Sequence, residues 1–395
     1  MKKQKEKFNL NRREFIWKTS LASMSLPAIM IHSQTNVWEN MEKDVIQWRN
    51  KHSDMAYRQL GRTGYMVSEV VCGGDPVSPQ TYKQVELAME MGLNYLDTAP
   101  AYGSGASEKG YGEILKSSSK REKVFVNTKI SGFTSIRNRM YREIFDGLPS
   151  GKQEMILKRA RDMRYERGVD KPGYFYIYWP GQEKSMDPSY LANAMVQDYA
   201  HKVDGSKEFR EFIFTSIEGS LERTKAGYFD LAMCPHGANC PEEVQFPEVF
   251  EVFEELKKQG KVRHMGVSSH NDPAGVLNAA VDTGKYDVAM VAYNFLNDGF
   301  LDGAIRKAYK ANVGVIGMKV AMPVATQHEE LKPLPAWREQ KLHKIVPGDL
   351  KAPVKAYLWA LQNPRISAVI SNLWDENYVR ENLSVVGKKI VLQRG

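Results

Sequence analysis

Cysteine is scarce in this chain, which has three in 395 residues: Cys72, Cys234 and Cys240. Three cysteines are too few to hold a chain of this size together with disulfides, and no Cys-x-x-Cys pair is present. Cys234, His236 and Cys240 lie close in sequence, but no fourth ligand stands at the spacing of a known zinc site. We therefore expect neither a disulfide framework nor a bound metal.

Long apolar runs are also missing. No stretch approaches the ~20 apolar residues that a membrane-spanning helix needs, so no transmembrane span is expected. The first predicted strand, Glu69–Cys72, leads into Cys72-Gly73-Gly74-Asp75 and not into a Gly-x-Gly-x-x-Gly turn. This absence argues against an open, doubly wound sheet that binds a dinucleotide at its first turn.

Positive charge is concentrated at the N-terminus. The formal net charge is +8, and residues 1–20 hold seven Lys or Arg against two Glu. The remainder of the chain is close to balanced. We therefore expect no nucleic-acid partner.

The first 33 residues combine this charge with a short apolar stretch. Arg12 and Arg13 are followed by Phe15 and then by the moderately apolar residues 21–31. The pattern resembles a twin-arginine export signal. The resemblance implies the twin-arginine export machinery as a partner and a periplasmic or exported protein. The alternative is a disordered basic tail on a cytoplasmic protein.

From residue 57 onward, short apolar segments alternate with helical patterns. Residues 247–259, for example, contain five apolar residues at helical spacing, namely Val249, Phe250, Val252, Phe253 and Leu256. Eight strand segments separated by helices predict an α/β fold, a TIM-type (β/α)8 barrel. The eight segments are Glu69–Cys72, Asn94–Asp97, Val124–Lys129, Tyr228–Cys234, Val262–Val267, Val288–Val291, Val313–Met318 and Ala368–Ile370.

Two segments do not follow this alternation of strands and helices. Residues 34–56 are polar and predict a linker with one short helix. Residues 133–210 form an insertion after the third strand, far longer than an ordinary loop. Its aromatic run, residues 174–181, predicts a lid or side wall over the pocket, with rings that suit sugar-like or other cyclic substrates. In the alternative interpretation, these aromatic side chains form the insertion's own small core.

Two predicted strands end in residues that titrate. Asp97 and Lys129 close the second and third strands, and Tyr102 follows shortly after Asp97. Because strand ends form the working face of a parallel barrel, the three side chains should converge. A nearby ammonium lowers the pKa of a tyrosine, and an aspartate keeps that ammonium charged. The trio predicts a tyrosine that exchanges a proton with an alkoxide, although each residue alone is as easily structural.

Ordered motifs along the chain resemble those of the aldo/keto reductase family. They are Tyr57–Ser68, which resembles the opening hairpin, Gly92–Gly103 with Ser107-Glu108, Thr128-Lys129, and Ser220–Arg223. The resemblance implies a barrel over residues 57–395 that begins with a β-hairpin. It also implies a catalytic set of Asp97, Tyr102, Lys129 and His236, with Tyr102 as the proton donor and His236 as a hydrogen-bond donor to the carbonyl oxygen.

The same resemblance implies a nicotinamide cofactor, NAD(H) or NADP(H). Family members usually present Lys and Arg to the 2′-phosphate of NADP(H) at the positions of Asn372 and Tyr378, and Asp375 beside them would repel a phosphate. We therefore favour NAD(H), with Arg380 as the residue that would reverse this preference. The implied cofactor-binding positions are Ser268, Ser269, Met290, Met318, Lys319, Arg380, Glu381 and Asn382.

These observations predict an NAD(P)-dependent oxidoreductase. Its substrate would be a small carbonyl or alcohol compound, namely an aldehyde, a ketone or a sugar-like molecule. The alternative is a barrel that keeps the nucleotide but acts as a binding or regulatory subunit. The intact set of Asp97, Tyr102 and Lys129 argues against that alternative.

Overall fold

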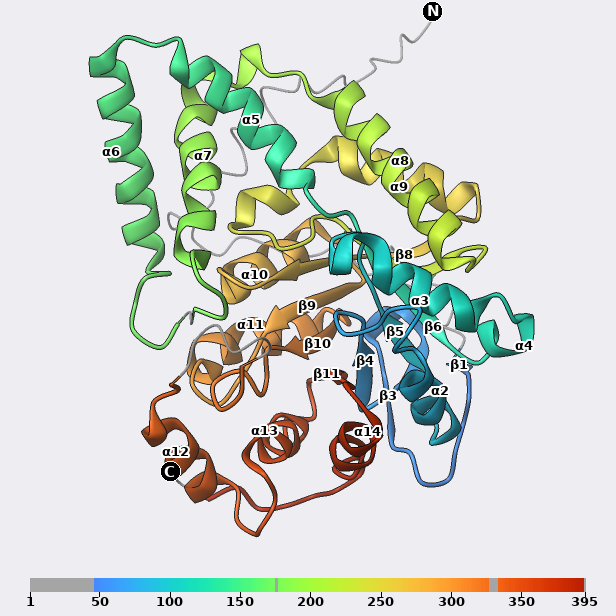
Figure 1. Cartoon of the computed structure of the whole chain (residues 1–395). Coiled ribbons are helices and arrows are strands. Elements are labelled where there is room, and N and C mark those ends of the chain that lie inside the picture. Colours follow the sequence, from blue (N-terminus) through green and yellow to red (C-terminus); the bar gives the residue numbers. More distant parts are fainter. Residues whose placement is uncertain (1–45, 175–176, 327–332, 394–395) are drawn as a thin grey trace, which may run out of the picture. The chain divides into compact units, whose positions relative to one another are not determined.

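A computed structural model of the chain describes residues 46–174, 177–326 and 333–393 (Figure 1). The predicted export signal, residues 1–33, and most of the predicted linker lie outside the described residues. In the part that is described, no helix combines the length and the apolar character needed to cross a membrane.

The predicted barrel is confirmed. Eight parallel strands close on themselves, and the last strand pairs with the first. Each observed strand overlaps one of the eight predicted segments. In order around the barrel, the strands are β4 (Val70–Gly73), β5 (Tyr95–Asp97), β6 (Phe125–Lys129), β7 (Phe229–Met233), β8 (Val262–Ser269), β9 (Val288–Ala292), β10 (Gly314–Met318) and β11 (Ala368–Asn372).

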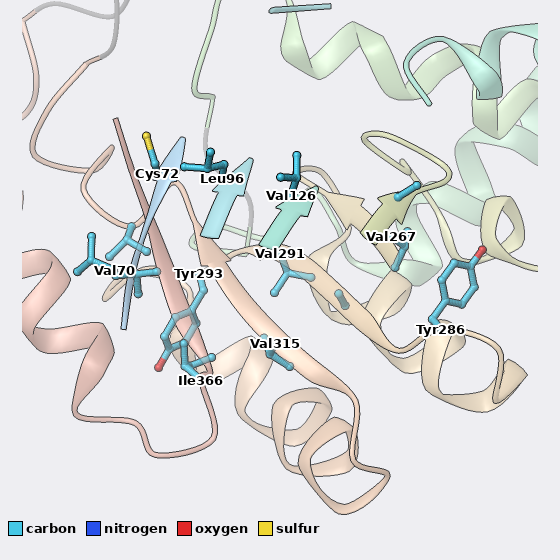
Figure 2. Close-up of a cluster of buried hydrophobic side chains, with 14 of the residues drawn as sticks. Val70, Cys72, Leu96, Val126, Val267, Tyr286, Val291, Tyr293, Val315 and Ile366 are labelled. Carbon is cyan, nitrogen blue, oxygen red and sulfur yellow. The ribbon is translucent and has the colours of Figure 1, made fainter. Parts of the chain in front are cut away.

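Alternation along the strands decides which side chains fill the barrel. Successive side chains of a strand point to opposite faces, so residues two apart share a face. Tyr95 and Phe125 lie in the interior cluster, with apolar side chains of the other strands. Their neighbours, among them Leu96 and Val126, point outward and pack beneath the helices (Figure 2). Asp97 follows Tyr95 by two positions, so it belongs to the inward set.

The strands are covered by helices whose apolar faces match the sequence pattern. Helix α9 (Pro247–Lys258) begins at a proline, which is favourable at the first helical position, and Gly260 follows its end with a φ of 70°. Four of the five apolar residues that the spacing singled out are buried, and Phe250 is partly buried. The other helices outside the insertion are α2 (Lys83–Glu90), α3 (Ala106–Leu115), α4 (Ser118–Arg121), α8 (Ser206–Thr224), α10 (Pro273–Thr283), α11 (Asp298–Lys310), α12 (Ala336–Ile345), α13 (Ala352–Leu361) and α14 (Glu376–Leu383).

Three helices form the insertion after β6 (Figure 1). They are α5 (Phe133–Asp146), α6 (Ser150–Arg167) and α7 (Asp187–Tyr199), and α8 already begins at Ser206. A separate apolar cluster holds them together and includes Tyr141, Ile156, Tyr174 and Met195. Tyr174 therefore belongs to the insertion's own core, which is the alternative left open for the aromatic run.

The chain directly before the barrel contributes a short strand. The short helix was predicted within residues 34–56, of which residues 34–45 lie outside the described part of the chain; residues 46–56 contain no helix. Instead β1 (Gln47–Trp48) pairs with β3 (Tyr65–Ser68) of the β-hairpin, whose other strand is β2 (Tyr57–Gln59). The physical reason is polar anchoring: Arg49 donates to the Val124 carbonyl at 2.6 Å, and Asn50 donates to the Met89 carbonyl at 2.6 Å.

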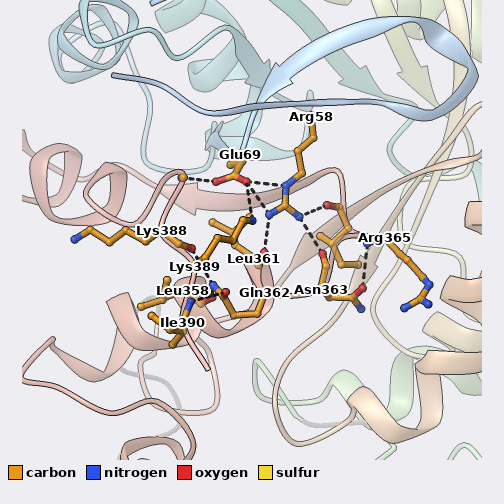
Figure 3. Close-up of polar contacts among 12 residues, drawn as sticks. Arg58, Glu69, Leu358, Leu361, Gln362, Asn363, Arg365, Lys388, Lys389 and Ile390 are labelled. Carbon is orange, nitrogen blue, oxygen red and sulfur yellow. Dashed lines mark hydrogen bonds and ion pairs between the residues drawn. The ribbon is translucent and has the colours of Figure 1, made fainter. Parts of the chain in front are cut away.

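Arg58 of the hairpin joins the two ends of the barrel chain (Figure 3). Its guanidinium donates to Glu69 at 2.7 Å and to the backbone carbonyls of Leu361, Asn363 and Ile366. Glu69 in turn accepts a hydrogen bond from the Gly387 N–H at 2.7 Å. This network holds the hairpin against the segment that follows α13 and α14.

Candidate active site

A buried ion pair lies at the carboxyl ends of β5 and β6. The Lys129 ammonium nitrogen lies 2.6 and 2.5 Å from the two carboxylate oxygens of Asp97, and 3.0 Å from the Thr98 carbonyl oxygen. Asn127 donates a further hydrogen bond to Asp97 at 2.5 Å. Both charged side chains are at most 2% exposed. Asp97 and Lys129 therefore converge as the sequence predicted.

Burial acts against both charges of this pair. It raises the pKa of Asp97 and lowers the pKa of Lys129, because the protein interior disfavours either charged form. Their mutual attraction opposes both shifts. The carboxylate accepts from the ammonium and from the Asn127 amide, and hydrogen bonds to the charged form favour it. The pair is therefore best described as ionised.

Tyr102 begins the short 3-10 segment η2 (Tyr102–Gly105) that follows β5. The half-buried phenol ring lies with its centre 4.6 Å from the Lys129 nitrogen. Burial, followed by the charges of Asp97 and Asp75, raises the pKa of Tyr102 well above its usual value. The expected lowering of this pKa is therefore wrong for this structure. The reason is that burial of the phenol disfavours its charged form, and that the negative charge of Asp97 offsets the Lys129 ammonium over the ring.

His236 reaches the same place from the loop after β7. Its ring centre lies 5.9 Å from that of Tyr102, with the two planes nearly perpendicular. Ser131 places its hydroxyl oxygen 2.7 Å from Nδ1 of His236. Burial, helped by the charges of Lys129 and Lys319, lowers the pKa of His236 to about 3. The imidazole is therefore neutral at physiological pH.

The loop that holds His236 is fastened to the end of β8. The Gly237 N–H donates to the Ser268 hydroxyl at 2.9 Å, and the Ala238 N–H donates to the Ser268 carbonyl at 2.8 Å. The Ser269 hydroxyl donates to the Ala238 carbonyl at 2.8 Å. Ser268 and Ser269, predicted as cofactor contacts, are therefore anchors of the histidine loop. These contacts bring His236 into the site.

Ser131 was not identified from the sequence, and it decides how His236 can act. A neutral imidazole has one nitrogen that donates and one that accepts. When Nδ1 accepts from the Ser131 hydroxyl, Nε2 carries the hydrogen and can donate to a bound oxygen. The only sequence signal for this residue is its place two positions beyond Lys129, at a strand end.

Other residues of the predicted signature hold the loops in place. Glu108 of α3 is fully buried and accepts from Thr128 at 3.0 Å and from Arg223 at 2.6 Å. The hydroxyls of Thr98 and Ser107 share a hydrogen bond of 2.7 Å. These contacts tie the segment after β5, which includes Tyr102, to β6 and α8.

The predicted cofactor positions at β9 and β10 are two buried methionines and one lysine. Met290 and Met318 are buried members of the interior cluster. Lys319, directly after β10, adopts a left-handed φ of 58°. Its ammonium lies 6.0 Å from the ring centre of Tyr178 and 5.6 Å from that of Trp179, both from the insertion. The insertion therefore contacts the strand ends where the cofactor was predicted.

The remaining predicted cofactor positions lie on α14. Arg380 is exposed and donates to Glu376 at 2.5 Å, one helical turn earlier. Glu381 accepts from Lys351 at 2.6 Å. Asn382 is buried and donates to the Ser371 hydroxyl. The charge of Arg380 is thus partly offset within its own helix.

Asp375 caps the N-terminus of α14. Its carboxylate accepts from the Tyr378 N–H at 3.0 Å. A helix N-terminus attracts anions, and here a carboxylate already occupies that position. A phosphate group brought to the same point would meet a like charge.

No metal site is evident at the His236 loop. The described parts of the chain contain no group of three or more His, Cys, Asp or Glu side chains arranged to hold a metal ion. Cys234 and Cys240 are buried free thiols, and His236 contacts Ser131.

Comparisons with known proteins agree with this geometry. The model of the aldo/keto reductase family matches residues 72–393. The uncharacterised oxidoreductase YqkF of Bacillus subtilis is 26% identical over 218 residues, covering 54% of this chain and 49% of that protein. The L-galactose dehydrogenase of Arabidopsis thaliana is 24% identical over 349 residues, covering 83% and 87%. This chain spans about half the length of the first curated relatives that it matches.

A solved structure also shares the fold. An aldo-keto reductase from Klebsiella pneumoniae in complex with NADPH superimposes with a TM-score of 0.51 at 15% identity, covering 86% of this chain and 91% of that one. At this identity the likeness establishes the fold alone.

The ion pair makes a testable prediction about stability. Lys129→Met leaves a buried carboxylate without its partner, so we expect the free energy of unfolding at pH 7 to fall by about 3 kcal/mol. Burial then holds the pKa of Asp97 above its unfolded value, so the carboxyl takes up a proton and the deficit shrinks as the pH falls toward 5. Chemical denaturation at the two pH values measures both effects.

The double variant Asp97→Asn/Lys129→Met is the matched control, because it removes both charges together. It should be more stable at pH 7 than Lys129→Met alone. If Lys129→Met lowers the free energy of unfolding by the same amount at both pH values, the pair is not ionised in the wild type.

Proposed function

Because the chain belongs to the aldo/keto reductase family, we propose that it is an oxidoreductase that transfers a hydride between a nicotinamide cofactor and a carbonyl or alcohol substrate. The observation that carries this proposal is the meeting of Tyr102, neutral His236 and the Asp97–Lys129 pair at one end of the barrel. An acid, a neutral hydrogen-bond donor and a fixed cation are the groups that proton transfer to a carbonyl oxygen requires.

Each residue has a distinct role in the proposed reaction. When bound, the nicotinamide supplies or accepts the hydride. Tyr102 donates its phenolic proton to the substrate oxygen in reduction and takes it back in oxidation. His236 donates from Nε2 to the same oxygen and orients it. Lys129 stabilises the phenolate that forms when the proton leaves, and Asp97 keeps Lys129 charged and in place.

The residues along one arc of the rim fit a nicotinamide nucleotide. Ser268, Lys319 and Asn372 provide polar groups at the ends of β8, β10 and β11, beside the proton-transfer residues. These residues, with those of α14, would hold the cofactor. The carboxylate of Asp375 at the start of α14 favours NAD(H), which has no 2′-phosphate, over NADP(H).

A sugar-like substrate is the substrate class that we propose. Tyr178 and Trp179 of the insertion lie at the strand ends of the site, and aromatic rings of this kind pack against the apolar faces of sugars. The similar L-galactose dehydrogenase is named for a sugar substrate. In this proposal the insertion is a side wall of the substrate pocket.

We also propose that the protein is exported through the twin-arginine pathway to the periplasm. The support is Arg12-Arg13, Phe15 and the short apolar stretch that follows them. Export of a folded protein suits an enzyme that binds its nucleotide in the cytoplasm.

Substitution of the phenol tests the central proposal. Tyr102→Phe removes the proton donor, so kcat should fall by a factor of about 10² to 10⁴ while calorimetric binding of the nucleotide is retained. Tyr165→Phe, at an exposed tyrosine of α6, is the matched control and should be unaffected. If the wild type binds nucleotide but reduces no carbonyl compound, the result would favour the alternative, a non-catalytic binding or regulatory subunit.

The cofactor preference can be tested at the helix cap. Asp375→Ser keeps a capping oxygen but removes the negative charge, so NADP(H) should bind about fivefold more tightly while NAD(H) changes little. Asp302→Ser on the exposed face of α11 serves as the control for loss of charge. If the wild type already binds NADP(H) better than NAD(H), the proposed preference is wrong.

Fractionation of bacterial cells tests the export proposal. Replacing both Arg12 and Arg13 with Lys should retain the protein in the cytoplasm. Replacing Lys2 and Lys3 with Arg exchanges the same number of basic side chains elsewhere in the segment, also without a change of charge, and should leave export intact. An Arg12→Lys/Arg13→Lys variant that still reaches the periplasm would exclude this route.

A further inference from the structure

His270 stands at the end of β8, directly after Ser269, and it is not part of the mechanism above. Its half-buried ring lies 5.1 Å from Trp179 and 6.4 Å from Tyr178, measured between ring centres. Nδ1 of His270 is buried, and none of the described residues gives it a hydrogen-bond partner. A buried polar atom without a partner is costly, so a partner is expected to arrive with water or a ligand.

The insertion is fixed beside this histidine by the next residue in the chain. Asn271 accepts from Gln182 at 2.7 Å and donates to Ser185 at 2.9 Å, both in the insertion. It also donates to Asn239 of the loop after β7 at 2.6 Å. The Asn271 amide therefore joins the insertion both to the end of β8 and to the loop after β7. The wall is attached to the same strand end that positions His270.

Tyr178 is held just as firmly. Its backbone N–H donates to the side chain of Gln182 at 2.6 Å, and its hydroxyl accepts from Asn294, which follows β9, at 3.1 Å. Lys319 adds an ammonium near the rings of Tyr178 and Trp179. The aromatic pair and the lysine therefore enclose His270 in a defined arrangement.

His270 directly follows Ser268 and Ser269, the two residues that anchor the His236 loop. Burial, followed by the positive charge of Lys319, holds the pKa of His270 well below its usual value. A neutral imidazole offers one donor and one acceptor. This combination matches a hydroxyl group, which also donates and accepts, better than it matches a carboxylate, which only accepts.

We propose that His270 binds a hydroxyl group of the substrate next to the reacting carbon, and that it thereby selects polyhydroxylated carbonyl and alcohol compounds. The inference rests on the proposed oxidoreductase function. Trp179 packs against the carbon skeleton of the same substrate. His270 is thus a specificity residue, and simple aldehydes do not need it.

Two aldehydes of equal chain length distinguish binding of a substrate hydroxyl group by His270 from a structural or cofactor role. Butanal has no hydroxyl groups, whereas erythrose is the corresponding trihydroxy aldehyde. His270→Phe should lower kcat/KM for erythrose about tenfold and leave that for butanal within about twofold, because a single hydrogen bond is lost. His270→Gln, which can still donate and accept, should restore most of the erythrose activity. His343→Phe, on the exposed surface of α12, is the matched control.

A binding measurement gives a readout apart from turnover. Calorimetric titration of the protein saturated with NADH should show about tenfold weaker binding of erythritol to His270→Phe than to the wild type, with the affinity for NADH unchanged. An equal loss for both aldehydes, or a loss of NADH affinity, would assign His270 a structural or cofactor role and overturn the proposal.

No change in either measurement would also overturn it. Should the wild type reduce neither aldehyde, the proposed function fails, and the erythritol titration alone decides the role of His270.

Discussion

The contact between the Lys129 ammonium and the Asp97 carboxylate is the interaction on which the rim of this barrel depends. Either charge alone would be costly at this depth, and together they satisfy each other and the Asn127 amide. Burial, followed by the charge of Asp97, raises the pKa of Tyr102, so the phenol is protonated in the resting protein. The value of the pair to the proposed reaction comes when the phenol loses its proton, because a fixed ammonium is then already in place.

The barrel geometry makes this contact possible. Asp97 lies opposite Asn127 across β5 and β6, and Lys129 is two positions farther along the same inward face. Below them the rings of Tyr95 and Phe125 fill the interior and exclude water. Around them, Glu108 joins α3 to β6 and α8, so the loop with Tyr102 has a fixed base. The signature motif therefore supports the loop structurally, in addition to its part in the proposed chemistry.

The insertion gives this barrel its individual character. It folds around a separate apolar core, yet its inner edge is bound by side-chain amides to the ends of β8 and β9. Lys319 and the rings of Tyr178 and Trp179 meet there beside His270. The insertion thus adds aromatic and amide side chains to one end of the barrel.

Residue pattern and spacing were enough to predict the eight strands and the convergence of Asp97, Tyr102 and Lys129, because inward alternation and strand ends are local properties of the chain. They did not reveal β1, the roles of Ser131 and His270, or the anchoring of the His236 loop by Ser268. Those depend on contacts between segments far apart in sequence. The direction of the Tyr102 pKa shift likewise required the tertiary structure, because it follows from burial and from where the Lys129 charge is offset.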